Sequence, residues 1–288
     1  MLWNFTSVNL KVFRYYKVQR GLEVLNKLEV RASLATELND PFELSPNIDP
    51  GQFDQRHIEA VLRQDHHIED AYHKEGYQRG FTSKKDFKRW YLKDVPRRAA
   101  EQLPKIARNV ESWKHEFARS FDNYWRIVCA SFVYDSILMW SHYADDHRGL
   151  VLAFDTTQVP FCQIPQDCWL TVNYSNKKPY YLYSHKQAEF RRKMFAVAAS
   201  KASPWAYERE LRIILPDTSL RDRHFLPLAP ESVAAVYCGC RISRADKTAV
   251  ELASRAPHLK HVELWLATLD ECEYALKFNR CNEEKLQH

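Results

Sequence analysis

The chain has 288 residues, of which 45% are hydrophobic and 27% are charged, so it can bury the core of one large globular domain. Its net charge of +5 is compatible with a phosphate-bearing ligand but is far below that of an obligate nucleic-acid binder. Its 6 glycines form neither a Gly-x-Gly-x-x-Gly motif nor a P-loop, which excludes the glycine-rich nucleotide sites.

The seven cysteines are odd in number and contain no Cys-x-x-Cys pair, which predicts reduced thiols and a cytoplasmic protein. No metal site is predicted, because Cys238 and Cys240 share a strand face but lack two further ligands. The N-terminal residues lack the pattern of a secretory signal, and no apolar run approaches ~18 residues. We therefore expect no membrane span and no membrane partner.

The N-terminal region predicts a strand at 10–16, a helix at 18–28 and a short strand at 31–34. Asn39-Asp40-Pro41 predicts a loop after them, because Asn and Asp side chains bond their own backbone and proline stops a helix.

Residues 51–120 are charged, carry few β-branched residues and have helical periodicity. They predict a helical insertion or cap within a single α+β domain that spans residues 1–288. Pro96 is expected in the first turn of the third helix of this insertion, where its missing N–H costs nothing.

The remaining elements are irregularly spaced, which indicates an α+β fold rather than a doubly wound sheet. Gly149 is expected to supply a positive φ between a helix and the strand after it. The predicted strands are 125–132, 150–154, 168–174, 211–215, 225–228, 233–240 and 261–266, and the predicted helices are 135–143, 183–198 and 245–255.

Residues 203–215, Ser-Pro-Trp-Ala-Tyr-Glu-Arg-Glu-Leu-Arg-Ile-Ile-Leu, contain the candidate catalytic pair, Glu208 and Glu210. If one strand includes both, their side chains point to one face, about 7 Å apart at ~3.3 Å per residue. Paired carboxylates are costly unless cations neutralise them or a reaction uses them. The nearby Arg209 and Arg212 favour a simple ion-pair cluster, whereas the adjacent Trp205 and Tyr207 favour a functional site.

Three blocks of the chain carry distinctive runs: 13–16 (Phe-Arg-Tyr-Tyr) with 38–43 (Leu-Asn-Asp-Pro-Phe-Glu), 138–145 (Leu-Met-Trp-Ser-His-Tyr-Ala-Asp) with Gly149, and 205–214 (Trp-Ala-Tyr-Glu-Arg-Glu-Leu-Arg-Ile-Ile). These blocks resemble a large bacterial family catalogued as domain of unknown function 2971. The resemblance spans nearly the whole chain but implies no function.

Arg14 on a first strand, Ser33 or Thr36 after a short helix, and a late Glu-x-Glu follow one another along the chain. This order is similar to that of the arginine-serine-glutamate ADP-ribosyltransferases. The similarity implies a split mixed or antiparallel sheet with NAD bound as a substrate in its cleft.

The same similarity implies a role for each matched residue. Glu210 would stabilise the oxocarbenium-like transition state as nicotinamide leaves, and Glu208 would orient or deprotonate the acceptor. Arg14 would hold a phosphate of NAD, Ser33 or Thr36 would steady the catalytic glutamate, and aromatic rings would stack on nicotinamide. The expected cofactor-binding residues are Arg14, Tyr15, Ser33, Thr36, Asn39, Asp40, His142, Tyr143 and Trp205.

The leading functional hypothesis is therefore an NAD-consuming transferase or glycohydrolase of the ADP-ribosyltransferase type, with a toxin or defence role and a protein or nucleic-acid acceptor. A second hypothesis is a metal-dependent nuclease or hydrolase that combines His142, Asp145 and Asp146 with Glu208 and Glu210. His142 and Asp146 have the i, i+4 spacing of one helical face. A third is a non-enzymatic module that binds a ligand or a protein through its aromatic residues.

Overall fold

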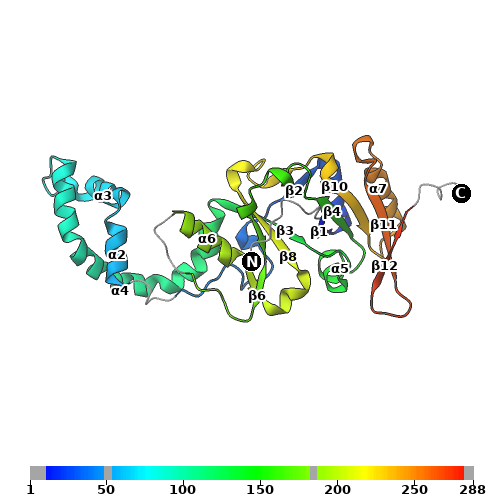
Figure 1. Ribbon diagram of the computed structural model, residues 1–288, viewed down its shortest axis with the longest axis horizontal. Helices are drawn as coiled ribbons and strands as arrows, with labels where there is room; N and C mark the ends of the chain where they lie inside the picture. Colours follow the sequence, from blue (N-terminus) through cyan, green and yellow to red (C-terminus); the bar gives the residue numbers. More distant parts are fainter. Residues whose placement is uncertain (1–10, 49–53, 182–186, 282–288) are drawn as a thin grey trace. The chain divides into compact units, whose positions relative to one another are not determined.

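The computed structural model describes residues 11–48, 54–181 and 187–281, which form two compact units (Figure 1). The first unit comprises Met1–Asp40, Asp122–Asn176 and Ala199–His288, and the second comprises Pro41–Phe121 and Lys177–Ala198. The chain is therefore divided into a sheet-containing unit and a helical unit, and the helical unit includes a second segment beyond the predicted insertion.

The first unit is built on an eight-stranded mixed sheet in the order β12-β11-β10-β4-β1-β3-β8-β5 (Figure 1). β10 and β11 pair in parallel, and the other neighbouring strands pair antiparallel. This arrangement confirms an α+β fold. The strands are β1 (Lys11–Tyr16), β3 (Trp125–Ser131), β4 (Leu150–Asp155), β5 (Trp169–Thr171), β8 (Glu210–Pro216), β10 (Val233–Cys238), β11 (Glu263–Leu269) and β12 (Leu276–Arg280).

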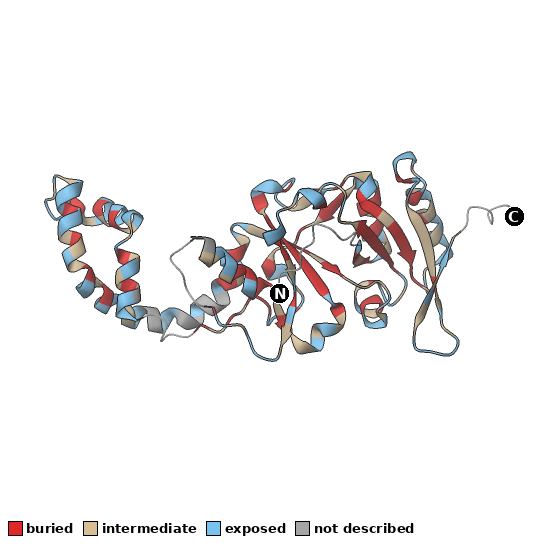
Figure 2. Ribbon diagram, viewed as in Figure 1, coloured by how far each residue is buried: buried red, intermediate tan, exposed pale blue. Residues whose placement is uncertain are grey.

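Helices pack against both faces of this sheet, and most residues of its central strands are buried (Figure 2). On one face, α1 (Val18–Lys27) and α7 (Arg244–Ser254) pack against a core that includes Leu152 and Ile213. On the other face, α5 (Ile137–Tyr143) places Trp140 in a core with Phe13. We call these the α1 face and the α5 face.

The sheet opens between β1 and β3. The two strands share the pair Phe13 and Ser131, and farther along β3 the residue Ser33 pairs with Ile127. Ser33 follows β2 (Glu29–Arg31), which forms a separate two-stranded sheet with β9 (Phe225–Pro227). The chain leaving β2 therefore lies along β3 where β1 has moved away.

Two predicted strands differ from the observed ones because the backbone changes partners. The predicted strand 168–174 is divided into β5 and β6 (Asn173–Ser175). Val172 donates its N–H to the carbonyl of Glu210 in β8, but the next residue donates to Ala199, just before β7 (Ser200–Ala202). The predicted strand 31–34 lies earlier, at β2, and β12 was not predicted.

Gly149 does not have the positive φ that we expected. Left-handed conformations are instead adopted by Asp145, Asp146 and His147, which reverse the chain after α5. Gly149 is required for a different reason, because a Cβ there would lie 2.2 Å from the carbonyl oxygen of Tyr16. The glycine allows two backbones to approach each other closely.

The second unit has its own helical core. The expected position of Pro96 was wrong, because this residue lies inside α4 (Lys84–Asp122) rather than in its first turn. Val95 and Ala99 on either side of it are buried, and this packing keeps the helix continuous past the proline. The other helices are α2 (Gln55–Leu62), α3 (Asp65–Ala71), the π-helix η4 (Tyr72–Gly76) and α6 (Gln187–Ala198).

The predicted helix 183–198 corresponds to α6 over Gln187–Ala198, and residues 183–186 lie outside the described part of the chain. Among the helices of the described residues, none combines the length and the apolar character that a membrane span requires.

Candidate functional site

The two glutamates of the candidate pair lie in different elements. Glu208 ends the 3-10 helix η7 (Ser203–Glu208), and Glu210 begins β8. Arg209 between them has a left-handed φ of 43°, which turns the chain. The expectation that both carboxylates point from one strand face was therefore wrong.

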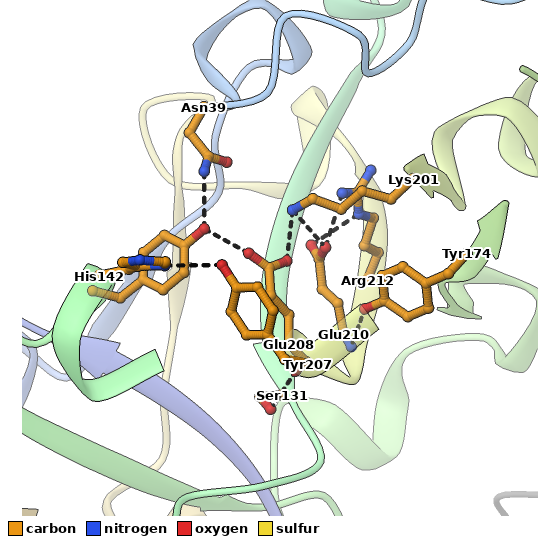
Figure 3. Close-up of polar contacts among 10 residues, drawn as sticks. Asn39, Ser131, His142, Tyr174, Lys201, Tyr207, Glu208, Glu210 and Arg212 are labelled. Atoms are coloured by element: carbon orange, nitrogen blue, oxygen red, sulfur yellow. Dashed lines mark hydrogen bonds and ion pairs between the residues drawn. The ribbon is translucent and has the colours of Figure 1, made fainter. Parts of the chain in front are cut away.

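The two carboxylates nevertheless meet at the ammonium group of Lys201, which comes from β7 (Figure 3). Its Nζ lies 2.6 Å from Oε2 of Glu208 and 3.3 Å from Oε2 of Glu210. All three side chains are buried. Lys201 was missed in the sequence, where its one signal is a lone cation within the run Ala-Ser-Lys-Ala at 199–202.

Of the two cations that the sequence suggested, Arg209 and Arg212, it is Arg212 that binds Glu210, with two parallel hydrogen bonds. Nε donates to Oε1 and Nη2 donates to Oε2, each over 2.9 Å, and Arg212 is 0% exposed. Two buried anions are thus matched by two buried cations, which limits the cost of removing them from water.

Burial acts on both carboxyl groups, but their pKa values move in opposite directions. Burial alone would raise the pKa of Glu210, yet the positive charges of Arg212 and Lys201 outweigh it and hold that pKa at about 2. Burial raises the pKa of Glu208, and the opposing effects of Lys201 and Tyr143 are smaller. Glu210 is therefore a permanent anion, whereas Glu208 can exchange a proton under milder conditions.

The phenol of Tyr143 joins Glu208 to the Asn39 loop. Its hydroxyl donates to Oε1 of Glu208 over 2.5 Å and accepts a hydrogen bond from Nδ2 of Asn39 over 2.8 Å (Figure 3). Burial raises the pKa of Tyr143, so the phenol stays protonated as a donor. Asp40 follows Asn39 and is buried.

Four ring-bearing side chains surround the carboxylates, namely His142, Tyr143, Trp205 and Tyr207, and we call them the aromatic rim. Nδ1 of His142 lies 2.9 Å from the hydroxyl of Tyr207, whose ring centroid is 6.1 Å from that of Trp205. Nζ of Lys201 lies 4.9 Å from the centroid of the Trp205 ring. The rim residues are exposed or half-buried, so the buried charges lie beneath accessible rings.

A fifth ring, that of Tyr174 in β6, supports the start of β8. Its hydroxyl accepts a hydrogen bond from the backbone N–H of Glu210 over 2.8 Å. Burial raises the pKa of Tyr174 to about 12. Tyr174 was not among the predicted site residues, because the sequence does not reveal that β6 lies beside Glu210.

Arg14 lies on the opposite face of the sheet from the carboxylates. Phe13 pairs with Ser131, and Ser131 pairs with Glu210, so these three side chains share the α5 face. Arg14 is the next residue along β1, and side chains alternate along a strand, so Arg14 projects from the α1 face. The structure thus does not bring Arg14 together with the glutamates.

Three other predicted residues also have separate contacts. Tyr15 donates its hydroxyl to the carbonyl of Val133 over 3.0 Å. Ser33 pairs through its backbone with β3, and the hydroxyl of Thr36 donates to Asp122 over 2.7 Å. The structure therefore does not join Tyr15, Ser33 or Thr36 to the carboxylate pair.

The ligand set of the metal hypothesis is not assembled in the structure. His142 lies against Tyr207, and the carboxylate of Asp146 lies 3.5 Å from Arg148. α5 ends at Tyr143 and left-handed residues follow, so the helical i, i+4 relationship that we expected does not form. The described residues contain no group of three or more His, Cys, Asp or Glu side chains arranged to hold a metal ion.

Residues 139–213 match a family described as a protein of unknown function (DUF2971). This match confirms the predicted family resemblance over that segment, which holds Tyr143, Lys201, Arg212 and both glutamates of the site. Comparisons with curated proteins and with solved structures gave no match.

Proposed function

We propose that this chain, whose residues 139–213 match the DUF2971 family, is an enzyme that breaks a glycosidic bond with Glu208 as its reacting carboxyl group. The observation that carries the proposal is the unequal surroundings of two buried carboxylates. Arg212 clamps Glu210 with two hydrogen bonds, whereas Glu208 contacts Lys201 and the phenol of Tyr143, and the two pKa values shift in opposite directions accordingly. Neighbouring acids whose environments separate their pKa values commonly divide the roles of proton carrier and fixed charge.

From the sequence, we expected Glu210 to stabilise the transition state. In our proposal Glu208 takes this role instead. Both oxygens of Glu210 are bound by Arg212, and Lys201 contacts one of them. A carboxylate clamped by two cations stays in place as an anion, and its pKa is about 2. Glu208 instead accepts one hydrogen bond at each oxygen, from the neutral phenol of Tyr143 and from Lys201, the cation that it shares with Glu210.

The substrate that we place first is NAD, cleaved at the bond between nicotinamide and ribose. Nicotinamide leaves with the bonding electron pair as a neutral base, and the ribose carbon becomes positively charged. Ionised Glu208 would stabilise that charge, and a water molecule or acceptor hydroxyl would add to the carbon while its proton passes to Glu208. Glu210 would remain ionised throughout.

The aromatic rim supports a ring-bearing substrate. Trp205 and Tyr207 belong to η7, the 3-10 helix that ends at Glu208. Their rings present flat faces on which a planar base can stack. Since the Glu208 side chain is 4% exposed, substrate entry requires the ring of Tyr143 or Tyr207 to turn away from it. The rim therefore would act both as a binding surface and as a cover.

The architecture bears on the ADP-ribosyltransferase resemblance in two ways. The opening between β1 and β3 supports a split sheet of that type. The position of Arg14 on the α1 face does not support its expected contact with a phosphate of NAD bound at Glu208. In our proposal Lys201 and the aromatic rim, rather than Arg14, hold the substrate at the carboxylates.

Release of nicotinamide from NAD, followed by chromatography, tests this proposal. Glu208→Gln keeps the side-chain volume but cannot carry the charge or the proton, so release should fall by about 100-fold or more. Glu231→Gln, at an exposed position in η9 (Pro230–Ser232), is the matched control and should keep wild-type activity. Absence of release by the wild-type protein, or full activity in Glu208→Gln, would overturn the proposal.

A further inference from the structure

The geometry points to a second ligand site, a pocket on the α1 face that binds the phosphate group of a small molecule through Arg14, Lys27 and Tyr16. This site is separate from the carboxylate pair, which lies on the α5 face, and the inference does not depend on the proposed glycosidic activity.

A cavity of about 230 Å³ lies between β1, α1 and β2. Four cationic side chains line it, and two carboxylates do so as well. The cations are Arg14, Arg20, Lys27 and Arg31, and the carboxylates are Glu23 and Glu29. The pocket is thus strongly polar and has an excess of positive charge.

The ion pairs around the cavity leave two of these cations uncommitted. Glu23 pairs with Arg20, and Glu29 pairs with Arg221 from outside the cavity lining. Arg31 pairs with Glu37, over 2.6 Å. Within the residues that the structure describes, Arg14 and Lys27 form no ion pair with a carboxylate.

Arg14 is held in place by contacts that leave most of its donors available. Its Nη1 donates to the carbonyl of Arg31 over 3.1 Å, and the guanidinium carbon lies 5.3 Å from the ring centroid of Tyr16. A guanidinium has five N–H donors in a rigid fork, and such a fork matches the oxygens of a phosphate.

Tyr16 adds a donor that lacks a partner. Its side chain is 8% exposed, and among the described residues its buried hydroxyl has no hydrogen-bond partner. Burial raises the pKa of this phenol, so it stays protonated. The guanidinium of Arg14 lies over the ring that carries this hydroxyl, and the charges of Arg14 and Arg20 lower the pKa by less than burial raises it. A buried donor without a partner beside uncommitted cations indicates that an anion completes the site.

Phosphate fits this arrangement better than a carboxylate does. A phosphate offers at least three terminal oxygens, and a carboxylate offers two. The pocket presents three donor groups, namely a guanidinium, an ammonium and a phenol, so a phosphate can accept hydrogen bonds from all of them. The cavity is smaller than the ~300–1,000 Å³ of sites for drug-sized ligands. The pocket therefore suits inorganic phosphate or a small phosphomonoester.

Calorimetric titration of the full chain at low ionic strength tests this inference with inorganic phosphate, glycerol 3-phosphate and citrate as probes. We expect one saturable site for a phosphate-bearing probe and much weaker binding of citrate. Arg14→Met should weaken the binding by about tenfold or more, and Tyr16→Phe should weaken it by about fivefold. Lys11→Met removes a cation from the exposed end of the same strand and should change the affinity by less than about twofold.

Tyr16→Phe keeps the ring and removes only the unpaired hydroxyl, so it decides the question if Arg14→Met fails to fold. Circular dichroism of each variant establishes its folding. The inference is overturned if neither phosphate probe binds, if citrate binds as tightly as phosphate, or if a folded Arg14→Met or Tyr16→Phe variant binds like the wild type. Because no NAD or turnover is involved, these outcomes are independent of the proposed reaction.

Discussion

Glu210 should contribute stability that depends on pH, because its folded-state pKa of about 2 lies below the ordinary value for a glutamate. The contribution is present above a pH of about 4.3 and is lost as the pH falls towards about 2. The shift corresponds to about 3 kcal/mol. Urea unfolding between about pH 2 and 7, at about one-unit steps, measures it.

Glu210→Gln should lower the free energy of unfolding at neutral pH by about 3–5 kcal/mol, because Arg212 then remains buried without its anion. The difference from the wild type should shrink as the pH falls. Glu208→Gln is the matched variant, and its effect on the free energy of unfolding should depend on pH in the opposite direction. The folded-state pKa of Glu208 is raised, so ionisation of Glu208 opposes folding as the pH rises. Parallel pH curves for the wild type and Glu210→Gln would contradict this assignment.

At the scale of elements, strand alternation separates the two candidate sites. Adjacent residues of β1 project from opposite faces, so Phe13 joins the α5 face and Arg14 joins the α1 face. A register shift of one residue would exchange these faces. The long pairing of β1 with β4, from Lys11 with Asp155 to Tyr16 with Leu150, fixes the register and therefore the separation of the sites.

The turn between α5 and β4 should tolerate no side chain at Gly149. Gly149→Ala should lower the free energy of unfolding by about 1–3 kcal/mol or more, because the added Cβ overlaps the backbone oxygen of Tyr16. Gly80→Asn is the control, because Gly80 has a positive φ of 79° but open space around it, and Asn tolerates that conformation. Equal melting temperatures for the wild type and Gly149→Ala would show that the backbones can separate at little cost.

At the scale of the whole molecule, the two units have separate cores and should respond separately to core mutations. Phe87 is fully buried in the helical core, and Phe87→Ala should destabilise it by about 3–5 kcal/mol. Ile213→Ala should act in the same way on the sheet core. Hydrogen exchange should then rise mainly in α2–α4 for the first variant and in the eight-stranded sheet for the second. Uniform exchange across the chain in both variants would show one cooperative unit instead.

Much of the fold could be predicted from local patterns. The strand before Lys17, the helix after it and the apolar strands around residues 130, 152 and 236 follow directly from periodicity, and the structure confirms them. The expected position of Pro96 in a helix and the expected positive φ of Gly149 were wrong. Both expectations rest on the local preferences of proline and glycine, which take no account of tertiary packing. Packing of neighbouring residues overrides the preference of proline, and contact with a distant carbonyl explains the glycine.

The sequence by itself determined the carboxylate pair and its two candidate cations, Arg209 and Arg212, because these residues are neighbours and their charges have to be balanced locally. Only the tertiary structure decided that Lys201 and Tyr143 complete the cluster and that Arg14 lies on the other face. The physical reason is that a side chain's partners depend on which strands pair and in which register. Those pairings join residues that are far apart along the chain, and no local pattern records them.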